Sequence, residues 1–306
     1  MTNSSVWLDI YLLCYNRPEF AKAAIQSILN QRVSGFQLIV SDNSSDDRVA
    51  RMVQADFPEV TLERRGNVPV QAHINICIAE ASADYFCLFH DDDLMGPDFV
   101  SEMRLASECF PDAVAIGANA WVLNVDKGTR MNSMSAIGTY QDIASSKDLF
   151  RRYFGRYQTG IAPFPSYIYR TAVAGKERFP DAGGKYADVS WLLRLASLGR
   201  VVWVNKQLMD YHIHGGNDGL QESRRDRLSF LGHIKRCPNY VNPTGISDYR
   251  YLIYKKIVAV DKGKPAHHAR TQRLNQYIRW QRVRRHLRFS ELPAMLRKHL
   301  LKCLAK

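Results

Sequence analysis

Short apolar runs alternate with amphipathic segments along the first third of the chain. Apolar runs of strand length occupy residues 7–15 (WLDIYLLCY), 36–42 (FQLIVSD) and 84–90 (DYFCLFH), and a polar turn follows each of them. Between them, residues 19–31 and 70–82 place apolar side chains at helical spacing. Strands and helices that alternate at these lengths predict parallel βαβ units with right-handed crossovers. The pattern therefore predicts an α/β fold with a mostly parallel central sheet flanked by helices.

The same alternation continues with a helix through Arg51 and Gln54, a strand at residues 59–65 and a helix at 98–110. Polar sequences stand at three strand ends: YNRP after the first strand, SDNSSDD after the second and HDDD after residue 89. In open α/β sheets, ligands bind beyond the carboxyl ends of the strands. We therefore expect these three sequences to line one crevice.

Length and composition favour a folded enzyme-sized protein. The chain has 306 residues and 46% hydrophobic content, enough for one large domain or for one domain with an appendage. The N-terminal MTNSSVWLD lacks the basic and apolar regions of a signal peptide, and the longest apolar run, residues 113–125, is too short to span a bilayer. The 6 cysteines form no CxxC pair, which argues for reduced thiols in the cytoplasm and against a disulfide frame or a zinc site.

The net charge of +12 is unevenly distributed. From Lys262 onward Lys and Arg are dense, and Glu291 is the only acidic residue. A basic tail of this kind binds an anionic partner, which could be nucleic acid, a phospholipid surface or an acidic protein.

The triplet Asp91–Asp93 has no neutralising residue close to it in sequence. Mg²⁺ and Mn²⁺ prefer oxygen ligands, so adjacent carboxylates at a strand end predict a divalent-cation site. Because side chains alternate along a strand, Asp91 and Asp92 are expected to point in different directions. The alternative is a solvated acidic loop before the next helix, for which Asp98 is the better placed cap.

Three further sites each allow two interpretations. Asp42 closes its strand and could accept a hydrogen bond from a base or sugar, or could form an Asx-type turn. Asp188 precedes an apolar helical stripe and could be an N-cap or a general base. His212 and His214, two residues apart, could bind metal together with an Asp, or could be structural.

Residues from about Val6 to about Asn217 resemble the GT-A-fold glycosyltransferases of the large inverting family 2 group. The resemblance rests on five segments in order: YNRPEFAKAAIQSILNQ, LIVSDNSSDD, GNVPVQAHINICIAEASADYFCLFHDDDLMGP, ADVSWLLRLASLGRVVWV and YHIHGGN. It implies a Rossmann-like GT-A catalytic domain in residues 1–220, and residues 221–306 are left as a basic, mainly helical C-terminal extension.

The resemblance also implies a nucleotide-diphosphate-sugar donor, with UDP as the expected nucleotide, and a Mn²⁺ or Mg²⁺ cofactor. Leu13, through its backbone, and Tyr15 match positions that line the base pocket. Asp42 matches the acid that binds the base, and Asp91 matches a residue near the ribose or the sugar. Asp92 matches the carboxylate that coordinates the metal, which supports the departing diphosphate as a Lewis acid.

Several positions depart from the family pattern. His90 stands where an acid is common, so metal binding rests on Asp92 and phosphate oxygens, or His90 is itself a ligand. Pro69 replaces a usual glycine, which puts the local loop geometry in doubt. Ala187 replaces the Glu of the family's ED motif, whose Asp corresponds to Asp188 and acts as the general base.

The resemblance favours His214 over His212 as a contact to the diphosphate or the metal. The expected mechanism is inverting: Asp188 deprotonates an acceptor hydroxyl, which attacks the anomeric carbon from the face opposite the nucleotide. The arginines Arg17, Arg64 and Arg65 could face phosphate, but surface arginine is the default interpretation.

The last residues form an amphipathic pattern, with Leu292, Leu296 and Leu300 on one face and Arg297 and Lys298 on the other. Such a helix can lie on an anionic membrane surface, or can pack on the protein or on a partner subunit. Membrane docking would place the protein on the inner face of the plasma membrane and would suit a lipid-linked saccharide acceptor.

The expected function is transfer of a sugar to a saccharide or lipid-linked saccharide acceptor in surface polysaccharide synthesis. A sugar nucleotidyltransferase is the rival enzyme, but it would carry a glycine-rich phosphate loop, and LCYNRPEF has no glycine. A nucleic-acid-binding protein is the rival from another class. Its basic tail has no recognised base-reading motif, and the acidic crevice would repel phosphate unless metal is bound, so nucleic acid is not expected as a partner.

Overall fold

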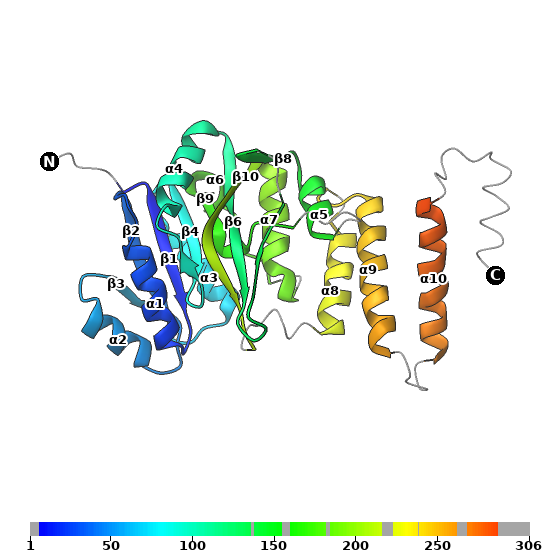
Figure 1. Ribbon diagram of the computed structural model, residues 1–306, viewed down its shortest axis with the longest axis horizontal. Helices are drawn as coiled ribbons and strands as arrows, with labels where there is room; N and C mark the ends of the chain where they lie inside the picture. The colour runs from blue at the N-terminus through cyan, green and yellow to red at the C-terminus, as the bar shows by residue number, and fades with distance from the viewer. Residues whose placement is uncertain are drawn as a thin grey trace.

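The computed structural model describes residues 6–135, 138–154, 160–181, 184–215, 223–237, 239–261 and 268–286. These residues form an α/β structure in which helices flank a 10-stranded sheet (Figure 1). The strands follow the order β3-β2-β1-β4-β9-β6-β10-β5, with β7 paired to β6 and β8 paired to β10. The α/β class predicted from the alternating pattern is confirmed.

The first half of the sheet is parallel, as the sequence pattern predicts. Its strands are β1 (Leu8–Cys14), β2 (Phe36–Asp42), β3 (Thr61–Arg64) and β4 (Tyr85–His90). The connecting helices are α1 (Pro18–Leu29), α2 (Arg48–Asp56) and α3 (Val70–Glu80). Cys14 of β1 is level with Asp42 of β2, and Leu13 is level with His90 of β4. The carboxyl ends of these strands therefore meet at one edge.

The second half of the sheet is mixed. Its strands are β5 (Leu94–Met95), β6 (Ala113–Asn124), β7 (Thr129–Asn132), β8 (Tyr140–Ile143), β9 (Tyr167–Arg170) and β10 (Arg200–Ile213). Its helices are α4 (Phe99–Cys109), α5 (Ser146–Phe154), α6 (Thr171–Ala174) and α7 (Ala187–Leu198), with short 3₁₀ turns η1 (Phe164–Ser166) and η2 (Gly184–Tyr186). Strand β9 pairs antiparallel with both β4 and β6, while β10 runs parallel to β6. Strands β9 and β6 thus separate β10 from β4, but the end of β10 reaches the turn after β4, where the N–H of His212 donates to Oδ1 of Asp93 at 2.9 Å.

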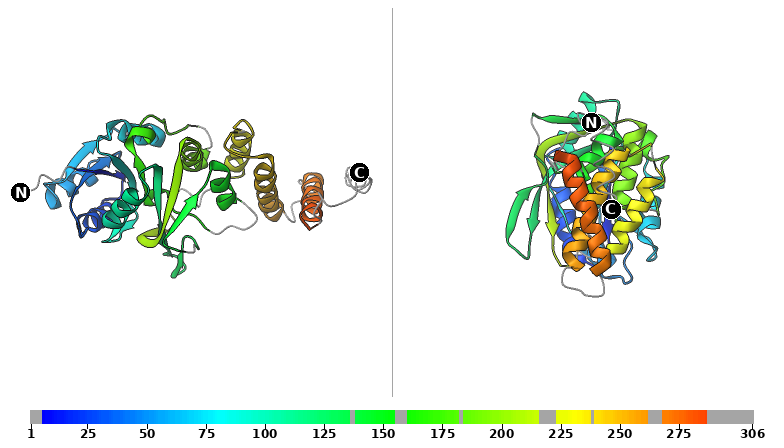
Figure 2. Two further views of the ribbon diagram at one scale, coloured as in Figure 1. Left: turned by 90° about the horizontal axis from the view of Figure 1, so that it is seen from above. Right: turned by 90° about the vertical axis from the view of Figure 1, so that its right-hand side faces the viewer.

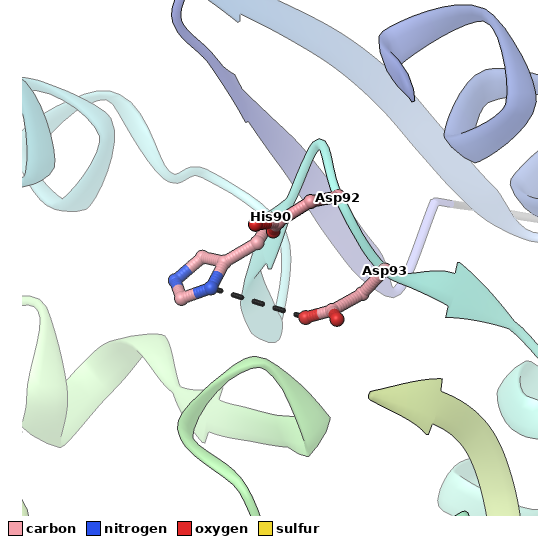
Figure 3. A group of neighbouring side chains, drawn as sticks. All are labelled: His90, Asp92 and Asp93. Carbon is pink, nitrogen blue, oxygen red and sulfur yellow. Dashed lines mark ion pairs between the residues drawn. The ribbon is translucent and has the colours of Figure 1, made fainter. Parts of the chain in front are cut away.

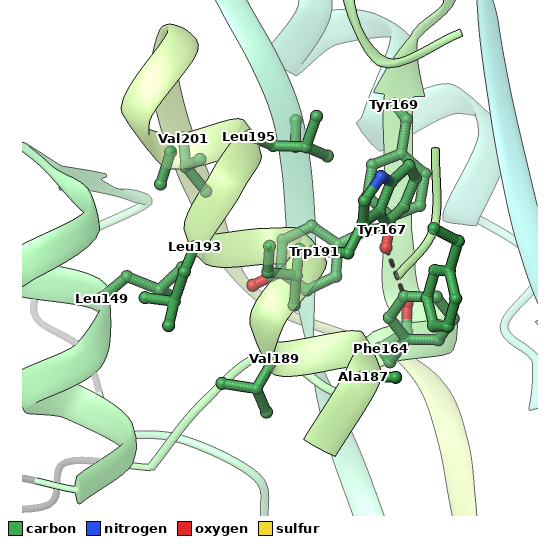
Figure 4. Packing of buried hydrophobic residues seen from close by; sticks show 14 of the residues in the cluster. Leu149, Phe164, Tyr167, Tyr169, Ala187, Val189, Trp191, Leu193, Leu195 and Val201 are labelled. Atoms are coloured by element: carbon green, nitrogen blue, oxygen red, sulfur yellow. Dashed lines mark hydrogen bonds between the residues drawn. The ribbon is translucent and has the colours of Figure 1, made fainter. Parts of the chain in front are cut away.

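Two hydrophobic clusters cover the two faces of the sheet. Successive residues of β1 point to opposite faces, so Ile10 and Leu12 pack with α1 and α4, whereas Tyr11 belongs to the cluster under α3 and α7. Trp191 of α7 is fully buried in the cluster under α3 and α7, with its ring centroid 4.6 Å from that of Tyr169 (Figure 4). This packing fixes α7, and with it the position of Asp188.

Three helices extend the molecule beyond α5 and α7. They are α8 (Arg224–Lys235), α9 (Pro243–Asp261) and α10 (His268–His286), and α10 lies outermost (Figure 2). A capping box begins α8, because Ser223 and Asp226 exchange side-chain and backbone hydrogen bonds. Phe230 of α8 and Tyr249 of α9 are buried with α5, so the first two helices share the core of the α/β part.

A helical region after the sheet is therefore present, as predicted. The amphipathic segment at Leu292–Leu304 lies outside the described residues. Among the helices that the structure does describe, none is both long enough and apolar enough to cross a membrane.

Candidate functional site

The strand ends of β1, β2 and β4 bring the predicted site residues together. The backbone N–H of Tyr15 donates to Oδ2 of Asp91 at 3.0 Å, and the N–H of Asn43 donates to the carbonyl of Cys14 at 3.0 Å. Leu13 is half-buried at the end of β1, while the side chain of Tyr15 is exposed. The three polar sequences therefore meet at one edge of the sheet, as predicted.

The acidic triplet is buried. Asp91, Asp92 and Asp93 are 0%, 7% and 1% exposed, so the interpretation as a solvated acidic loop is wrong. The expected divergence of Asp91 and Asp92 is also wrong, because both carboxylates accept hydrogen bonds from the guanidinium of Arg17. Strand alternation does not apply here: β4 ends at His90 and the two aspartates lie in a turn. Asp98 does stand at the N-cap of α4, but its carboxylate binds Arg32 rather than the helix N-terminus.

The triplet and its neighbours fit a divalent cation. His90, Asp92 and Asp93 each offer a ligand atom, and these atoms lie within 4.8 Å of one another (Figure 3). Oδ2 of Asp93 is buried, and within the part of the chain that the structure describes it has no hydrogen-bond partner; it lies 3.9 Å from Nδ1 of His90. Carboxylate oxygens are the ligands that Mg²⁺ and Mn²⁺ prefer. An unpaired buried acceptor beside a second carboxylate and an imidazole is a donor set that a cation would complete.

The three carboxyl groups differ in how readily they ionise. Burial raises the pKa of Asp91 to about 6, although Arg17 and the Tyr15 N–H oppose this. Burial and the charge of Asp92 raise the pKa of Asp93 well above its usual value. Burial works against ionisation of Asp92 too, but nearby His90 when protonated, the charge of Arg17 and hydrogen bonds from His214 and Arg17 bring its pKa below the usual value. Asp92 is therefore the member of the triplet that ionises most readily, and Asp91 with a pKa of about 6 is also largely ionised at neutral pH.

The two histidines at the end of β10, His212 and His214, have different contacts. His214 places Nε2 3.2 Å from Oδ2 of Asp92. His212 instead uses Nδ1 at 2.8 Å from the backbone carbonyl of Asp92, and its N–H donates to Oδ1 of Asp93 at 2.9 Å. Only the His214 ring reaches the carboxylate predicted to hold metal, which agrees with the preference for His214 from the sequence.

Asp42 is fully buried at the end of β2. Its Oδ1 accepts from the N–H of Ser44 at 2.9 Å, so the Asx-type turn is present, and its Oδ2 pairs with Arg64 at 3.2 Å. Arg64 is 40% exposed and lies on the outer side of this pair. Contact between Asp42 and a nucleobase stays a prediction.

Asp188 is the second residue of α7, and the N-cap is Tyr186, so the N-cap interpretation is wrong. Burial raises the pKa of Asp188 to about 6, against the effect of the backbone N–H groups of Val189 and Asp188. A carboxylate with a pKa in this range is suited to accept a proton near neutral pH.

Tyr211 of β10 links this carboxyl to the acidic triplet. Burial raises the pKa of Tyr211, and the charges of Asp93, Asp188 and Asp92 raise it further. The charges of the candidate base and of the candidate metal carboxylate therefore both act on the pKa of this tyrosine.

The sequence analysis named Arg17 only as a possible phosphate contact, with surface arginine as the default, and it missed Phe20. Arg17 is 32% exposed and binds two buried carboxylates, so its interpretation as a surface arginine is wrong. Phe20 stacks on the His214 ring with the centroids 5.3 Å apart. A positive charge three residues after a buried strand, opposite an unneutralised acidic triplet, was a signal for Arg17; no sequence signal marks Phe20.

The loop that carries Arg17 has a defined conformation. Asn16 adopts φ 56°, a left-handed conformation that Asn tolerates better than most residues. Its N–H donates to Oγ of Ser44 at 2.8 Å and its Oδ1 accepts from the N–H of Ser45 at 2.9 Å. Pro18 then begins α1, a position where its missing N–H costs nothing. These bonds direct Arg17 toward the triplet.

The loop around Pro69 is also held by hydrogen bonds. Asn67 is left-handed with φ 56°, and the Asn43 amide both donates to and accepts from the backbone of Val68 at 2.8 Å. Pro69 itself is the N-cap residue of α3. The replacement of glycine thus leaves a hydrogen-bonded loop beside the end of β2.

Comparisons with known proteins agree with this geometry. A family model described as "Glycosyl transferase family 2" matches residues 9–171. Chondroitin synthase of Escherichia coli is 22% identical over 249 residues, which cover 80% of this chain and 34% of that protein. The putative glycosyltransferase EpsE of Bacillus subtilis is 28% identical over 100 residues, or 31% of this chain and 36% of EpsE. The chain thus spans about a third of the length of these curated relatives.

Solved structures share the fold at low sequence identity. Residues 1–349 of S. aureus TarS in complex with UDP superpose with a TM-score of 0.56 at 13% identity, covering 90% of this chain and 91% of that one. The mannosyltransferase PcManGT from Pyrobaculum calidifontis, in complex with GDP-Man and Mn²⁺, gives 0.55 at 12% identity and covers 87% of this chain and 79% of its own. The family model spans more than half of the sequence, and the strand ends carry the acidic site expected of that family. The chain therefore belongs to glycosyl transferase family 2, as a glycosyltransferase of the GT-A fold.

Proposed function

We propose that the protein transfers a sugar from a nucleoside-diphosphate sugar to a saccharide acceptor, with inversion at the anomeric carbon. The observation that carries this proposal is the position of Asp92. It is a charged, buried carboxylate at the end of β4, in contact with His214, and the charges of Asp92 and Asp188 both act on the pKa of Tyr211.

The donor's nucleoside would bind at the ends of β1 and β2. Leu13 and Tyr15 would line the base pocket, Asp42 would accept a hydrogen bond from the base, and Asp91 would lie near the ribose or the sugar. The structural neighbours carry UDP and GDP-Man in their names, which supports a nucleotide-sugar donor. We retain UDP as the expected nucleotide.

Mn²⁺ or Mg²⁺ would be held by Asp92, with His214 on one side or with His90 and Asp93 on the other. When bound there, the cation would supply positive charge to the departing diphosphate. Asp93 and Asp91 are less readily ionised ligands for the cation than Asp92, because burial raises the pKa of both groups.

Asp188 would act as the general base. It would take the proton of an acceptor hydroxyl, whose oxygen attacks the anomeric carbon from the face opposite the nucleotide. The bond between that carbon and the diphosphate oxygen breaks as the new glycosidic bond forms, and the configuration inverts. A base with a pKa of about 6 is ionised at neutral pH and still basic enough to accept the proton.

The acceptor would be a saccharide or a lipid-linked saccharide in polysaccharide synthesis, because the relatives include a chondroitin synthase. Residues 1–220 would form the catalytic domain and residues 221–306 a basic extension. All of the chain's positive charge excess lies in that extension, which could rest on an anionic membrane surface close to such an acceptor.

A thermal-shift and hydrolysis screen tests the proposal. The protein would be incubated with UDP-, GDP-, CDP- and dTDP-sugars with and without Mn²⁺, beside an Asp92→Asn variant of the same shape. We expect one donor class to raise Tm and to be hydrolysed slowly by the wild type in the presence of Mn²⁺ but not by the variant. A wild type that responds to no nucleotide sugar, or a variant that responds equally, would refute the proposal.

A further inference from the structure

The guanidinium of Arg17 binds carboxylate oxygens of the turn that contains Asp91 and Asp92. It lies 2.8 Å from Oδ2 of Asp92 and also binds Oδ1 of Asp91. The two carboxylates are 8% and 0% exposed, whereas the arginine side chain is 32% exposed. The guanidinium therefore approaches from the solvent side, while the two carboxylates that it binds lie in the interior.

The same oxygen of Asp92 is the one that His214 reaches at 3.2 Å. A divalent cation bound to that oxygen would stand about 2 Å from it. A guanidinium nitrogen at 2.8 Å from the same atom would then compete with the cation for space, and two positive charges would face each other in a buried setting. A cation on this face of Asp92 therefore requires that Arg17 give up the contact.

The side chain of Arg17 can leave without disturbing the backbone. It makes no cap hydrogen bond to α1, and the loop is held by Asn16 through its bonds to Ser44 and Ser45. The guanidinium already lies 5.9 Å from the centroid of the Phe20 ring, which is exposed to solvent. Arginine stays charged at all relevant pH values, and its planar fork matches phosphate oxygens well.

We propose that Arg17 holds the cation position of the Asp91–Asp92 pair in the unliganded protein and moves to the donor's diphosphate when a divalent cation takes Asp92. The inference rests on the proposed function and adds a residue that binds the leaving group. Arg17 would neutralise the buried carboxylates before the metal arrives and the diphosphate afterwards. A purely structural Arg17 would keep its two carboxylates in both states.

A mobile Arg17 and a purely structural Arg17 predict different effects on Mn²⁺ binding when the side chain is removed. Free Mn²⁺ would be followed by electron paramagnetic resonance during titration of the full chain, first alone and then with saturating UDP. The variants are Arg17→Ala and Arg17→Lys, and Arg48→Ala is the matched control because Arg48 is an exposed arginine at the start of α2 that pairs with Asp46 at 2.9 Å.

Without nucleotide, Arg17→Ala is expected to bind Mn²⁺ about tenfold more tightly than the wild type, because a competing charge is gone; this corresponds to about 1.4 kcal/mol. With Mn²⁺ present, the same variant is expected to bind UDP about tenfold more weakly, as judged by calorimetry. Arg17→Lys should fall between, since a single ammonium cannot bridge two carboxylates, and Arg48→Ala should match the wild type.

Equal or weaker Mn²⁺ affinity in Arg17→Ala would overturn the inference, as would unchanged affinity for UDP. If Arg17→Ala does not fold, as judged by circular dichroism, Arg17→Lys decides: wild-type affinity for both ligands overturns the inference. A wild type that binds neither Mn²⁺ nor UDP refutes the proposed function instead, so the two failures are distinguishable.

Discussion

The ring of Phe20 stacks on the imidazole of His214, with the ring planes 13° apart and the centroids at 5.3 Å. Phe20 belongs to the first turn of α1, and His214 follows the last residue of β10. The stack therefore joins two ends of the chain's α/β part at the point where His214 approaches Asp92. Phe20 is 45% exposed, so it contributes little to the core and acts on the site through the position of the imidazole.

Phe20→Ala is expected to weaken Mn²⁺ binding by a few-fold to about tenfold, because the His214 ring loses the surface that orients it. Global stability should change by less than about 1 kcal/mol, since nearly half of the side chain is already in solvent. Paramagnetic resonance titration and urea unfolding measure the two quantities. Leu29→Ala, which removes a 47% exposed side chain at the other end of α1, is the control; equal Mn²⁺ affinity in both variants would contradict the prediction.

Asp93 distinguishes the two ligand sets available to the metal. Its Oδ1 accepts from the His212 N–H, whereas Oδ2 has no partner among the described residues and faces His90. Asp93→Asn would keep the first contact and remove one carboxylate ligand. If the metal uses His90, Asp92 and Asp93, this change should reduce Mn²⁺ affinity at least tenfold.

The complementary variant is His214→Ala. If the metal uses Asp92 and His214, this substitution should cause the greater loss and Asp93→Asn should have little effect on Mn²⁺ affinity. Calorimetric titration of both variants compares the sets directly. Full Mn²⁺ affinity in both would mean that neither His214 nor Asp93 is a ligand.

The alternating pattern was sufficient to predict the parallel strands, because β1, β2 and β4 are largely buried on both faces and the helices between them have apolar sides, while β3 is a mostly exposed strand at the edge of the sheet. It also predicted the meeting of Tyr15, Asp42 and Asp91, since the ends of neighbouring parallel strands share one edge. It could not predict that β9 inserts antiparallel between β4 and β6, because that pairing joins segments far apart in sequence.

The contacts of Arg17 were not predictable for a related physical reason. A local pattern cannot show that the left-handed Asn16 directs the side chain of Arg17 toward Asp92, in a turn 75 residues further along the chain. The direction of Asp91 and Asp92 failed as a prediction because it depended on where β4 ends. A one-residue change in a strand end decides whether alternation or turn geometry applies.

Trp191 is expected to be a major contributor to the stability of the α/β part. It is fully buried, and its ring contacts Phe86, Phe164, Tyr169 and Phe179. Trp191→Ala should lower the free energy of unfolding by about 3–5 kcal/mol. Leu198→Ala on the same helix, where the side chain is 43% exposed, should cost less than about 1 kcal/mol. Chemical denaturation of both variants measures this, and similar midpoints would argue against the packing.

Activity should depend on pH through Asp188. Its pKa is raised to about 6, and a general base works only in its ionised form. With a fixed donor and metal concentration, kcat/KM should therefore be flat above about pH 7 and fall about tenfold per pH unit below about pH 6. A profile in which the acid limb lies near pH 4, the usual range of an aspartate, would show that Asp188 is not the base.

Asp188→Asn should separate catalysis from stability. Below about pH 3 the carboxyl is largely neutral in both the folded and the unfolded chain, so the substitution should leave stability unchanged. As pH rises, the unfolded chain ionises this group near 3.8 while the folded protein resists ionisation until about 6. The folded state is therefore penalised above about pH 6, and removal of the charge should stabilise it there.

The penalty follows from the pKa difference, at about 1.4 kcal/mol per unit, reduced because Asp188 is partly exposed to solvent. The free energy of unfolding of Asp188→Asn should consequently exceed that of the wild type by about 1–2 kcal/mol at pH 8 and should equal it at about pH 3. Transfer activity should fall at least 100-fold while Mn²⁺ and UDP still bind. Denaturant unfolding at the two pH values is the measurement. A variant that is destabilised at pH 8 would mean that the carboxylate supports the start of α7, and its loss of activity would then say nothing about a base.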